Sequence, residues 1–342
     1  MSKKIYICKQ TKHVGRMREK QDEGVLMTRM GSLLHFLVDG LCICCLYAMV
    51  APFGVIHLVG IFITYNVLAF GTQPLTGLWA DTMGWKHWLL LIGDILLAAG
   101  VLVASLVLVV SSASTRELVM FSAATLLGLG NSLFHVWGGK LTAVTTGNDI
   151  RALGVFVSTG AFGLAVGGLF FSWPLAFVFL LLICLLSVAV IHCGEWGEMG
   201  REIRRKPFGW LLVLAAVLGL MLFVSFRSSV SEVFSSGIVK NEYMILAIGA
   251  TAMLGKMAGG WIAEWLGIVR TIVVLLIGVT VCWLALKWLA DGYWLMLVGL
   301  FLINCTMPVT LYLANKVLKG REGLAFGLLA AALIPGYLLV TM

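Results

Sequence analysis

The sequence predicts an all-α integral membrane protein built from two related bundles of transmembrane helices, and three observations support this prediction. Hydrophobic residues make up 61% of the 342 residues and charged residues only 12%, with a mean hydropathy of +1.02. In a soluble domain about a quarter of the residues are charged. Long apolar runs recur along the chain, each near the roughly 20 residues that a helix needs to cross a bilayer. One ten-residue phrase also occurs twice, each time between two such runs.

Apolar runs of sufficient length predict eleven transmembrane helices. They cover residues 31–51, 57–80, 87–110, 118–142, 152–172, 174–192, 209–229, 243–264, 270–289, 292–316 and 323–340. Residues 1–30 are basic and contain no apolar stretch, so they predict a cytoplasmic N-terminal tail and not a signal peptide. Lys and Arg also gather in the turns on the side of this tail, which places the N-terminus inside.

The runs divide into a six-helix bundle at 31–192, a cytoplasmic linker at 193–208 and a C-terminal bundle at 209–342. The second bundle has five runs, so the pattern matches a twelve-helix protein that lacks its last helix. We expect a multi-pass monomer of the cytoplasmic (inner) membrane. The net charge of +8 fits basic loops that face anionic lipid headgroups, so we expect the lipid bilayer and no nucleic acid as a partner.

The repeated phrase is a short turn that carries a carboxylate and two glycines. Its copies match at a constant offset, since 260 − 77, 264 − 81 and 267 − 84 all equal 183: Gly77, Asp81 and Gly84, followed by Lys86, and Gly260, Glu264 and Gly267, followed by Arg270. This pattern resembles the loop signature of the major facilitator superfamily. The resemblance implies the major-facilitator fold, in which two pseudo-symmetric helical bundles surround a central path, with about 11 of the expected 12 helices present here.

Each repeated carboxylate lies at the C-terminus of a helix, where the helix dipole disfavours negative charge. In transporters of this superfamily the equivalent acid faces the start of the eleventh helix. The resemblance therefore implies a latch between Asp81 and Arg321 or the neighbouring amides. By symmetry it implies a second latch between Glu264 and Arg151. Both would form only when the cytoplasmic side is shut. The alternative is that these charges are solvated and the glycines only permit tight turns.

Polar side chains inside the spans are the candidate functional residues, because an ionisable group at bilayer depth costs about 2.5–3.5 kcal/mol on insertion scales. They are His35 and Asp39 in the first span, Asn131, His135 and Lys140 in the fourth, and Arg227 in the seventh. His35 and Asp39 lie four residues apart and so share one helix face. We expect Asp39 to carry a coupling proton, with His35 beside it. His35 has the alternative of a hydrogen bond to a neighbouring helix.

In the superfamily, helices 1, 4, 7 and 10 line the central cavity, so the resemblance places Asn131, His135, Lys140 and Arg227 along the transport path. Arg227 is then a fixed positive charge for an anionic substrate, or else it snorkels to the interface. Lys256, in the eighth span, lies nearer the cytoplasmic side, where we expect it to pair structurally near the latches.

Two shorter motifs concern the direction of transport. Residues 130–139 resemble the Phe-His-Pro-x-Gly stretch of fosmidomycin-resistance-type transporters, with Val136 in the place of the proline. Residues 163–168 are similar to the G-P-x-x-G-G signature of exporters, with Leu164 in the place of the proline. Members of the first group export small antibiotics, so the resemblance implies export.

These patterns predict a secondary active transporter that exports a small anionic or amphiphilic compound in exchange for protons, by alternating access. No nucleotide-binding motif is present, so we expect no enzyme activity, no metal and no cofactor, with the proton gradient as the energy source. Two alternatives stay open. One is a proton-coupled symporter that takes up a small metabolite, and the other is a membrane sensor or scaffold that does not transport.

Overall fold

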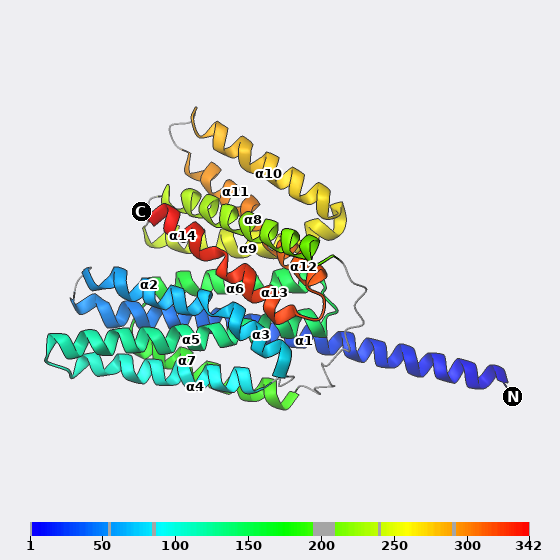
Figure 1. The fold of residues 1–342 in the computed structure, drawn as a ribbon, viewed down its shortest axis with the longest axis horizontal. Coiled ribbons are helices and arrows are strands. Elements are labelled where there is room, and N and C mark those ends of the chain that lie inside the picture. Colours follow the sequence, from blue (N-terminus) through cyan, green and yellow to red (C-terminus); the bar gives the residue numbers. More distant parts are fainter. Residues whose placement is uncertain are drawn as a thin grey trace.

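The computed structural model describes residues 2–53, 56–83, 87–193, 209–238, 241–288 and 292–341. Within these ranges it contains helices and no strand (Figure 1). The first half holds α1 (Ser2–Val50), α2 (Ile56–Gly71), α3 (Gln73–Met83), α4 (Trp88–Ser105), α5 (Ala113–Thr145), α6 (Ile150–Leu169) and α7 (Trp173–Cys193). The second half holds α8 (Trp210–Ser236), α9 (Glu242–Leu266), α10 (Ile268–Ala285), α11 (Tyr293–Asn304), α12 (Met307–Val317), α13 (Glu322–Ala331) and α14 (Leu333–Thr341).

The all-helical fold is confirmed, and helices cover all eleven predicted runs, although three of the runs consist of two helices each. These are α2 with α3, α11 with α12, and α13 with α14. In the described part of the chain, nine helical segments are long and apolar enough to cross a membrane, with α11 and α12 counted as one. The pairs α2–α3 and α13–α14 cover the other two predicted runs.

The first helix begins earlier than its apolar run. α1 starts at Ser2 and not at residue 31, so the helix also covers the predicted tail. The sequence there is rich in Lys, Arg, Glu, Gln and Met, which have high helix propensity even without an apolar face. Hydropathy locates the span but not the start of the helix.

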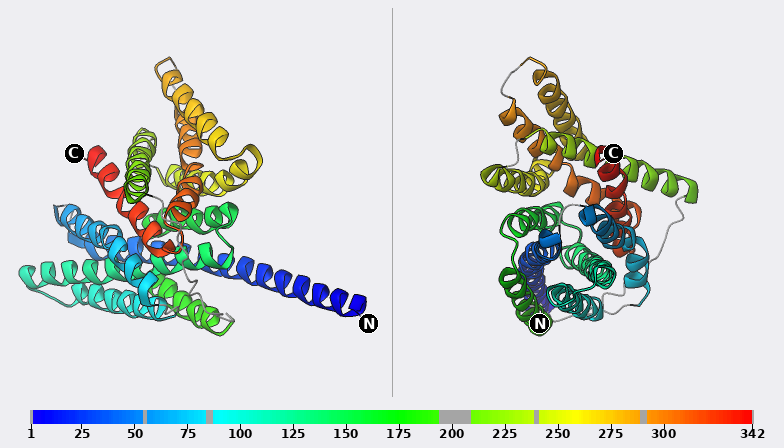
Figure 2. Two further views of the ribbon diagram at one scale, coloured as in Figure 1. Left: turned by 45° about the vertical axis from the view of Figure 1, so that its right-hand side comes forward. Right: turned by 90° about the vertical axis from the view of Figure 1, so that its left-hand side faces the viewer.

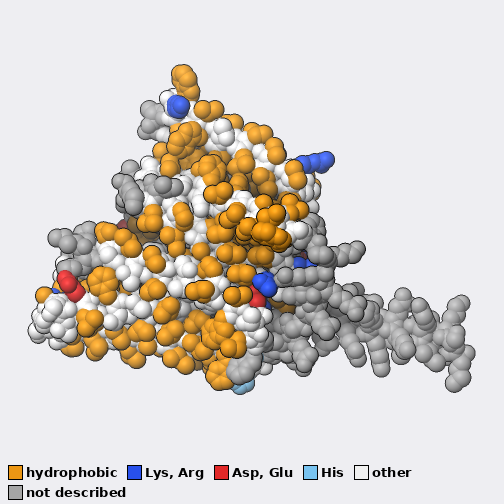
Figure 3. Space-filling view, viewed as in Figure 1, with side chains coloured by type: hydrophobic (Ala, Val, Ile, Leu, Met, Phe, Trp, Pro, Cys, Tyr) orange, Lys and Arg blue, Asp and Glu red, His pale blue; other side chains and the backbone are white. Residues whose placement is uncertain are grey.

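The two halves form two bundles that lie against each other (Figures 1 and 2). Within the first bundle, α1 packs against α5, α6 and α7. Across the junction, α6 packs against α9 and α3 packs against α13. Hydrophobic side chains cover much of the outer face in view, with few charged ones among them (Figure 3). Such a surface suits lipid contact and not water, and the chain is a multi-pass membrane protein.

Matched glycines of the repeat allow both close crossings between the bundles. A Cβ on Gly77 would overlap the backbone of Gly323 in α13. A Cβ on Gly260 would lie 2.7 Å from the carbonyl oxygen of Ile150 and 2.8 Å from Cα of Arg151 at the start of α6. Small residues let helix backbones approach closely in membranes. The internal repeat of the sequence is therefore also a repeat of the contacts between bundles.

Candidate functional site

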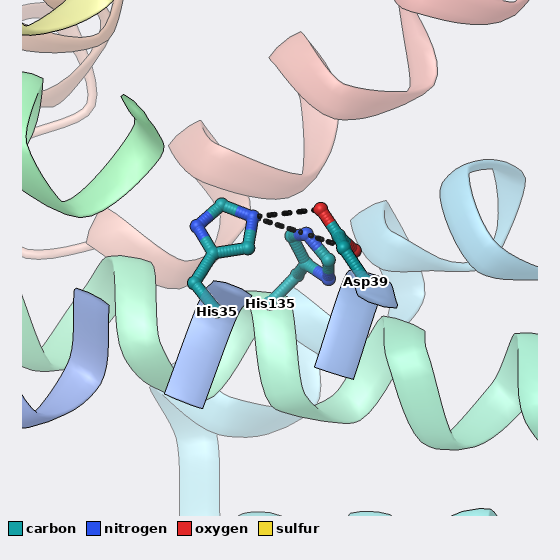
Figure 4. A group of neighbouring side chains, drawn as sticks. All are labelled: His35, Asp39 and His135. Carbon is teal, nitrogen blue, oxygen red and sulfur yellow. Dashed lines mark hydrogen bonds and ion pairs between the residues drawn. The ribbon is translucent and has the colours of Figure 1, made fainter. Parts of the chain in front are cut away.

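Three predicted residues meet in a buried polar cluster between α1 and α5, which we call the His–Asp–His cluster: His35, Asp39 and His135 (Figure 4). His35 Nε2 lies 3.2 Å from Oδ2 of Asp39, and His135 Nε2 lies 3.5 Å from Oδ1. The two Nε2 atoms are 2.8 Å apart. Asn131 donates a hydrogen bond of 3.0 Å from Nδ2 to Oδ1 of Asp39. All four residues are less than a tenth exposed.

Helix geometry explains the arrangement. His35 and Asp39 are four residues apart on α1, and Asn131 and His135 are four residues apart on α5, so each pair lies on one helix face. The two faces are turned toward each other. α6 covers the cluster with Gly160, where a Cβ would overlap both Oδ2 of Asp39 and Nε2 of His35. Nothing in the spacing of the sequence indicated this role of Gly160.

Aromatic rings surround the histidines. The ring of Phe156 on α6 lies 5.0 Å from that of His35, measured between centroids. Phe326 of α13 belongs to the other bundle, and its ring is 6.5 Å from that of His135 and 6.1 Å from that of Phe156. The cluster thus lies at the junction of the two bundles, in apolar surroundings.

Positive charge lies across the junction from the cluster. Arg227 on α8 is 3% exposed, and its Nε and Nη2 atoms have no hydrogen-bond partner among the described residues. Lys256 on α9, which we expected to pair near the latches, is close enough to interact electrostatically with Arg227, Asp39 and His135. Its position in the repeat matches Gln73, since 256 − 73 = 183. The carbonyl oxygens of Gln73 and Lys256 each lie close to a glycine of the other bundle, Gly327 and Gly154.

The first latch is formed by Asp81 at the end of α3. Its carboxylate accepts hydrogen bonds from the amides of Gly323, at 3.0 Å, and Leu324, at 2.8 Å, in the first turn of α13. A carboxylate at a helix N-terminus accepts hydrogen bonds from the unpaired amides, and its negative charge interacts favourably with the helix dipole. Two kinds of partner were predicted for Asp81, Arg321 and the neighbouring amides. The amides bind Asp81, and Arg321 is exposed.

Lys140 lies at this latch and not in the cavity where we expected it. Its Nζ is 3.1 Å from Oδ1 of Asp81 and donates a 2.6 Å hydrogen bond to the carbonyl oxygen of Ala80. Lys140 follows His135 by five residues, which is about 7.5 Å along the helix axis, and its long side chain reaches further in the same direction. It therefore neutralises the latch carboxylate.

The second latch joins Glu264 to Arg151 at 3.0 Å, as predicted. Arg151 also forms an ion pair with Asp149 at 3.0 Å. The carboxylate of Asp149 accepts a hydrogen bond from the backbone amide of Arg151, so Asp149 caps the N-terminus of α6. Partial burial raises the pKa of the Asp149 carboxyl, but the hydrogen bonds and charge of Arg151 outweigh it and hold the pKa below 3.8. This latch is more exposed than the first.

The remaining predicted gate residues have simpler positions. Gly84 and Lys86 lie outside the described residues. Gly267 ends α9 with a φ of 81°, a conformation that favours glycine. Arg270 is exposed near the start of α10. For these two residues the positions agree with a tight, solvated turn.

Comparison with solved structures identifies the fold. Neither a family model nor a curated protein matches the sequence. The crystal structure of the major facilitator superfamily transporter FucP in the outward conformation is similar, with a TM-score of 0.71, 11% identity and coverage of 93% of this chain and 91% of that one. A structure of the E. coli fucose:proton symporter FucP has a TM-score of 0.68 and 11% identity, with coverage of 93% of this chain and 90% of that one. A bacterial homologue of the iron transporter ferroportin, in an outward-facing state, has a TM-score of 0.61 and 15% identity, with coverage of 92% of this chain and 90% of that one.

Proposed function

We propose that this chain, which has the fold of major facilitator superfamily transporters, is a secondary active transporter that works by alternating access. One observation carries the proposal: two latches, built from matched residues of the repeat, join the bundles at one end, and the buried cluster lies at their junction. In alternating access, two bundles rock around a site near the bilayer midplane. Opening of the latch end would break the latches, so they would form in one state only.

Arg227 supports an anionic substrate, because its buried Nε and Nη2 atoms have no hydrogen-bond partner among the described residues. A buried charge without compensation costs several kcal/mol, and a bound anion would supply the compensation. Lys256 adds a second positive charge nearby. We propose export of a small anionic or amphiphilic compound in exchange for protons, with the His–Asp–His cluster as the coupling site and the proton gradient as the energy source.

Uptake by proton symport is the second candidate, and the position of Lys256 favours it. Lys256 interacts with both the cluster and Arg227. A proton bound at the cluster makes this region more positive, so it would help an anion to bind at the same time. Exchange requires instead that the proton and the substrate exclude each other.

The experiment is transport in proteoliposomes that contain the purified chain and an internal pH dye. A pH gradient is imposed and a panel of small phosphonates, phosphates and carboxylates is added. We expect one class to cause proton flux, and the direction of that flux separates exchange from symport. Arg227→Gln should abolish the flux, and Arg29→Gln is the matched control at an exposed arginine outside the latches and the cluster.

The outcomes separate the hypotheses. Flux that is unchanged in Arg227→Gln would contradict the role of this residue in anion binding. A folded protein whose melting temperature rises with one of these anions, but which moves neither protons nor radiolabelled anion, would be a sensor or scaffold and not a transporter.

A further inference from the structure

Hydrogen bonds to backbone carbonyls fix the tautomer of both cluster histidines. His35 Nδ1 lies 2.7 Å from the carbonyl oxygen of Phe156, and His135 Nδ1 lies 2.9 Å from that of Asn131. A carbonyl oxygen only accepts hydrogen bonds, so both Nδ1 atoms carry a hydrogen. In the neutral form of each ring, Nε2 then presents a lone pair.

With both rings neutral and Asp39 ionised, the centre of the cluster holds acceptors only. The two Nε2 atoms are 2.8 Å apart, and the carboxylate oxygens lie 3.2 and 3.5 Å from them. Two lone pairs repel at 2.8 Å, which is instead a normal donor–acceptor distance for a hydrogen bond. The geometry therefore requires a bound cation, and the shortest contact fits a proton between the two nitrogens.

A proton on Asp39 would not relieve this contact. A protonated carboxyl group could donate to one Nε2, but the two Nε2 lone pairs would still face each other at 2.8 Å. A proton on one Nε2 is donated to the other, and the resulting imidazolium lies beside the carboxylate. Asn131 still donates to that carboxylate, which favours its ionised form.

We propose that the coupling proton is held between His35 Nε2 and His135 Nε2, and that Asp39 stays ionised as its counter-charge. That this proton drives transport rests on the proposed function. The location of the proton differs from the sequence-based expectation that Asp39 itself carries it. The step breaks no bond to carbon: a proton from water on one side binds the imidazole pair, and it leaves to water on the other side. The net charge of the cluster changes from −1 to zero.

The surroundings of the pair limit it to one proton. Asp39 faces it from α1, and Lys256 faces it from α9. α6 contributes Gly160 and Phe156, and α13 contributes Phe326, none of which is ionisable. One negative and one positive neighbour favour a single added charge, and a second proton would meet both the imidazolium and the ammonium group.

The same element that forms the first latch also covers the pair. Phe326 of α13 contacts Gly139 of α5, one turn beyond His135, and its ring lies near both His135 and Phe156. The latch amides belong to the first turn of α13. When α13 withdraws at the latch end, Phe326 would withdraw with it, which opens a route for the proton on that side.

The test is ¹⁵N NMR of histidine-labelled full-length protein in lipid nanodiscs, across the pH range 5 to 9. It needs no transport, so it stands apart from the test of the proposed function. We expect the two Nε2 signals to titrate together, with a ¹⁵N–¹⁵N coupling across the hydrogen bond while the proton is bound. His35→Gln and His135→Gln should each remove the coupling. His192→Gln is the control, because His192 is exposed and bonds a carbonyl through Nδ1 in the same way.

Asp39→Asn separates the proposal from its rival. The coupled Nε2 signals should persist in this variant, with their titration moved to lower pH because the counter-charge is gone. Proton flux should move in the same direction and remain measurable. If Asp39→Asn abolishes proton flux at every pH, while exchange of labelled substrate and the two separate histidine signals persist, Asp39 is the carrier and the proposal is wrong.

Metal binding is the other outcome that overturns it. Two imidazoles and a carboxylate form a donor set that first-row transition metals use, and their ligand atoms lie within 4.8 Å of one another. Stoichiometric metal in the purified protein, or one-to-one binding of added Zn²⁺ that is lost in both His→Gln variants, would show that the pair holds a metal. No retained metal, together with the coupled signals, supports the proton.

Discussion

Gly77→Ala should open the latch end, because this glycine sets the distance between α3 and α13. A methyl group there would overlap the carbonyl group of Gly323 and lie 2.8 Å from the amide nitrogen of Leu324. Ordinary contacts of a methyl carbon are about 3.5–4.0 Å. The two helices must therefore move apart by about 1 Å where Asp81 binds the amides.

The magnitude follows from the two hydrogen bonds of Asp81, which are 3.0 and 2.8 Å long. An added 1 Å takes both beyond the normal donor–acceptor range. Hydrogen bonds to charged groups contribute about 1.5–3 kcal/mol each, so the closed state loses at least about 3 kcal/mol. Each 1.4 kcal/mol is a factor of ten, so the population open at the latch end should rise about 100-fold.

The assay is the labelling rate of one cysteine by a maleimide added from the latch side, in a background where the native cysteines are replaced. Thr142→Cys is suitable, since Thr142 is 1% exposed and its hydroxyl has no hydrogen-bond partner among the described residues. Gly219→Ala is the control, because a Cβ there would meet nothing within 4 Å. A folded Gly77→Ala protein that labels at the control rate would refute the reasoning.

Three further outcomes are expected. Arg227→Met should leave the melting temperature unchanged or raise it, because the substitution removes a buried charge whose desolvation costs several kcal/mol. A fall of several degrees would reveal a structural partner. Glu264→Gln should increase the same labelling rate only a few-fold, and less at high salt, since an exposed ion pair contributes about 0.2–1 kcal/mol; an effect as large as that of Gly77→Ala would contradict the difference between the latches. Asp149→Ala should lower the melting temperature through loss of the cap, by about 1 kcal/mol. Because the pKa of Asp149 is lowered in the folded protein, that loss should be constant above about pH 5 and disappear as the pH falls below 3.8; a difference that persists in acid would assign it to packing.

The sequence predicted the spans because hydropathy, a local pattern, locates membrane helices. The partners of Asp81 and Glu264 are distant in the sequence, and they were predicted from the resemblance of the repeated turn to the major facilitator signature and from its symmetry. The breaks at Thr72, Cys305 and Ala332 were not predicted. The apolar runs conceal the breaks, but a proline follows each of them within three residues: Pro74, Pro308 and Pro335. Proline has no backbone N–H and clashes with the preceding turn, so it interrupts the helix just before it.

The candidate site was predicted in parts. Spacing along a helix shows that His35 and Asp39 share a face, but not which way that face points. The contact between His35 and His135 depends on the rotation of α1 relative to α5, which no spacing within either helix contains. The same limit applies to Lys256, whose direction across the bundle junction is a property of the packing of α9.

In the proposed transport cycle, the cations Arg227 and Lys256 would also give sensitivity to membrane voltage. Each elementary charge that crosses the full field gains or loses about 2.3 kcal/mol per 100 mV. With a proton on the histidine pair, these two cations are the uncompensated charge among the central groups described here. A divalent anion would make the loaded centre electrically neutral, whereas a monovalent anion would leave one positive charge. The effect of voltage on the loaded step therefore reports the charge of the substrate.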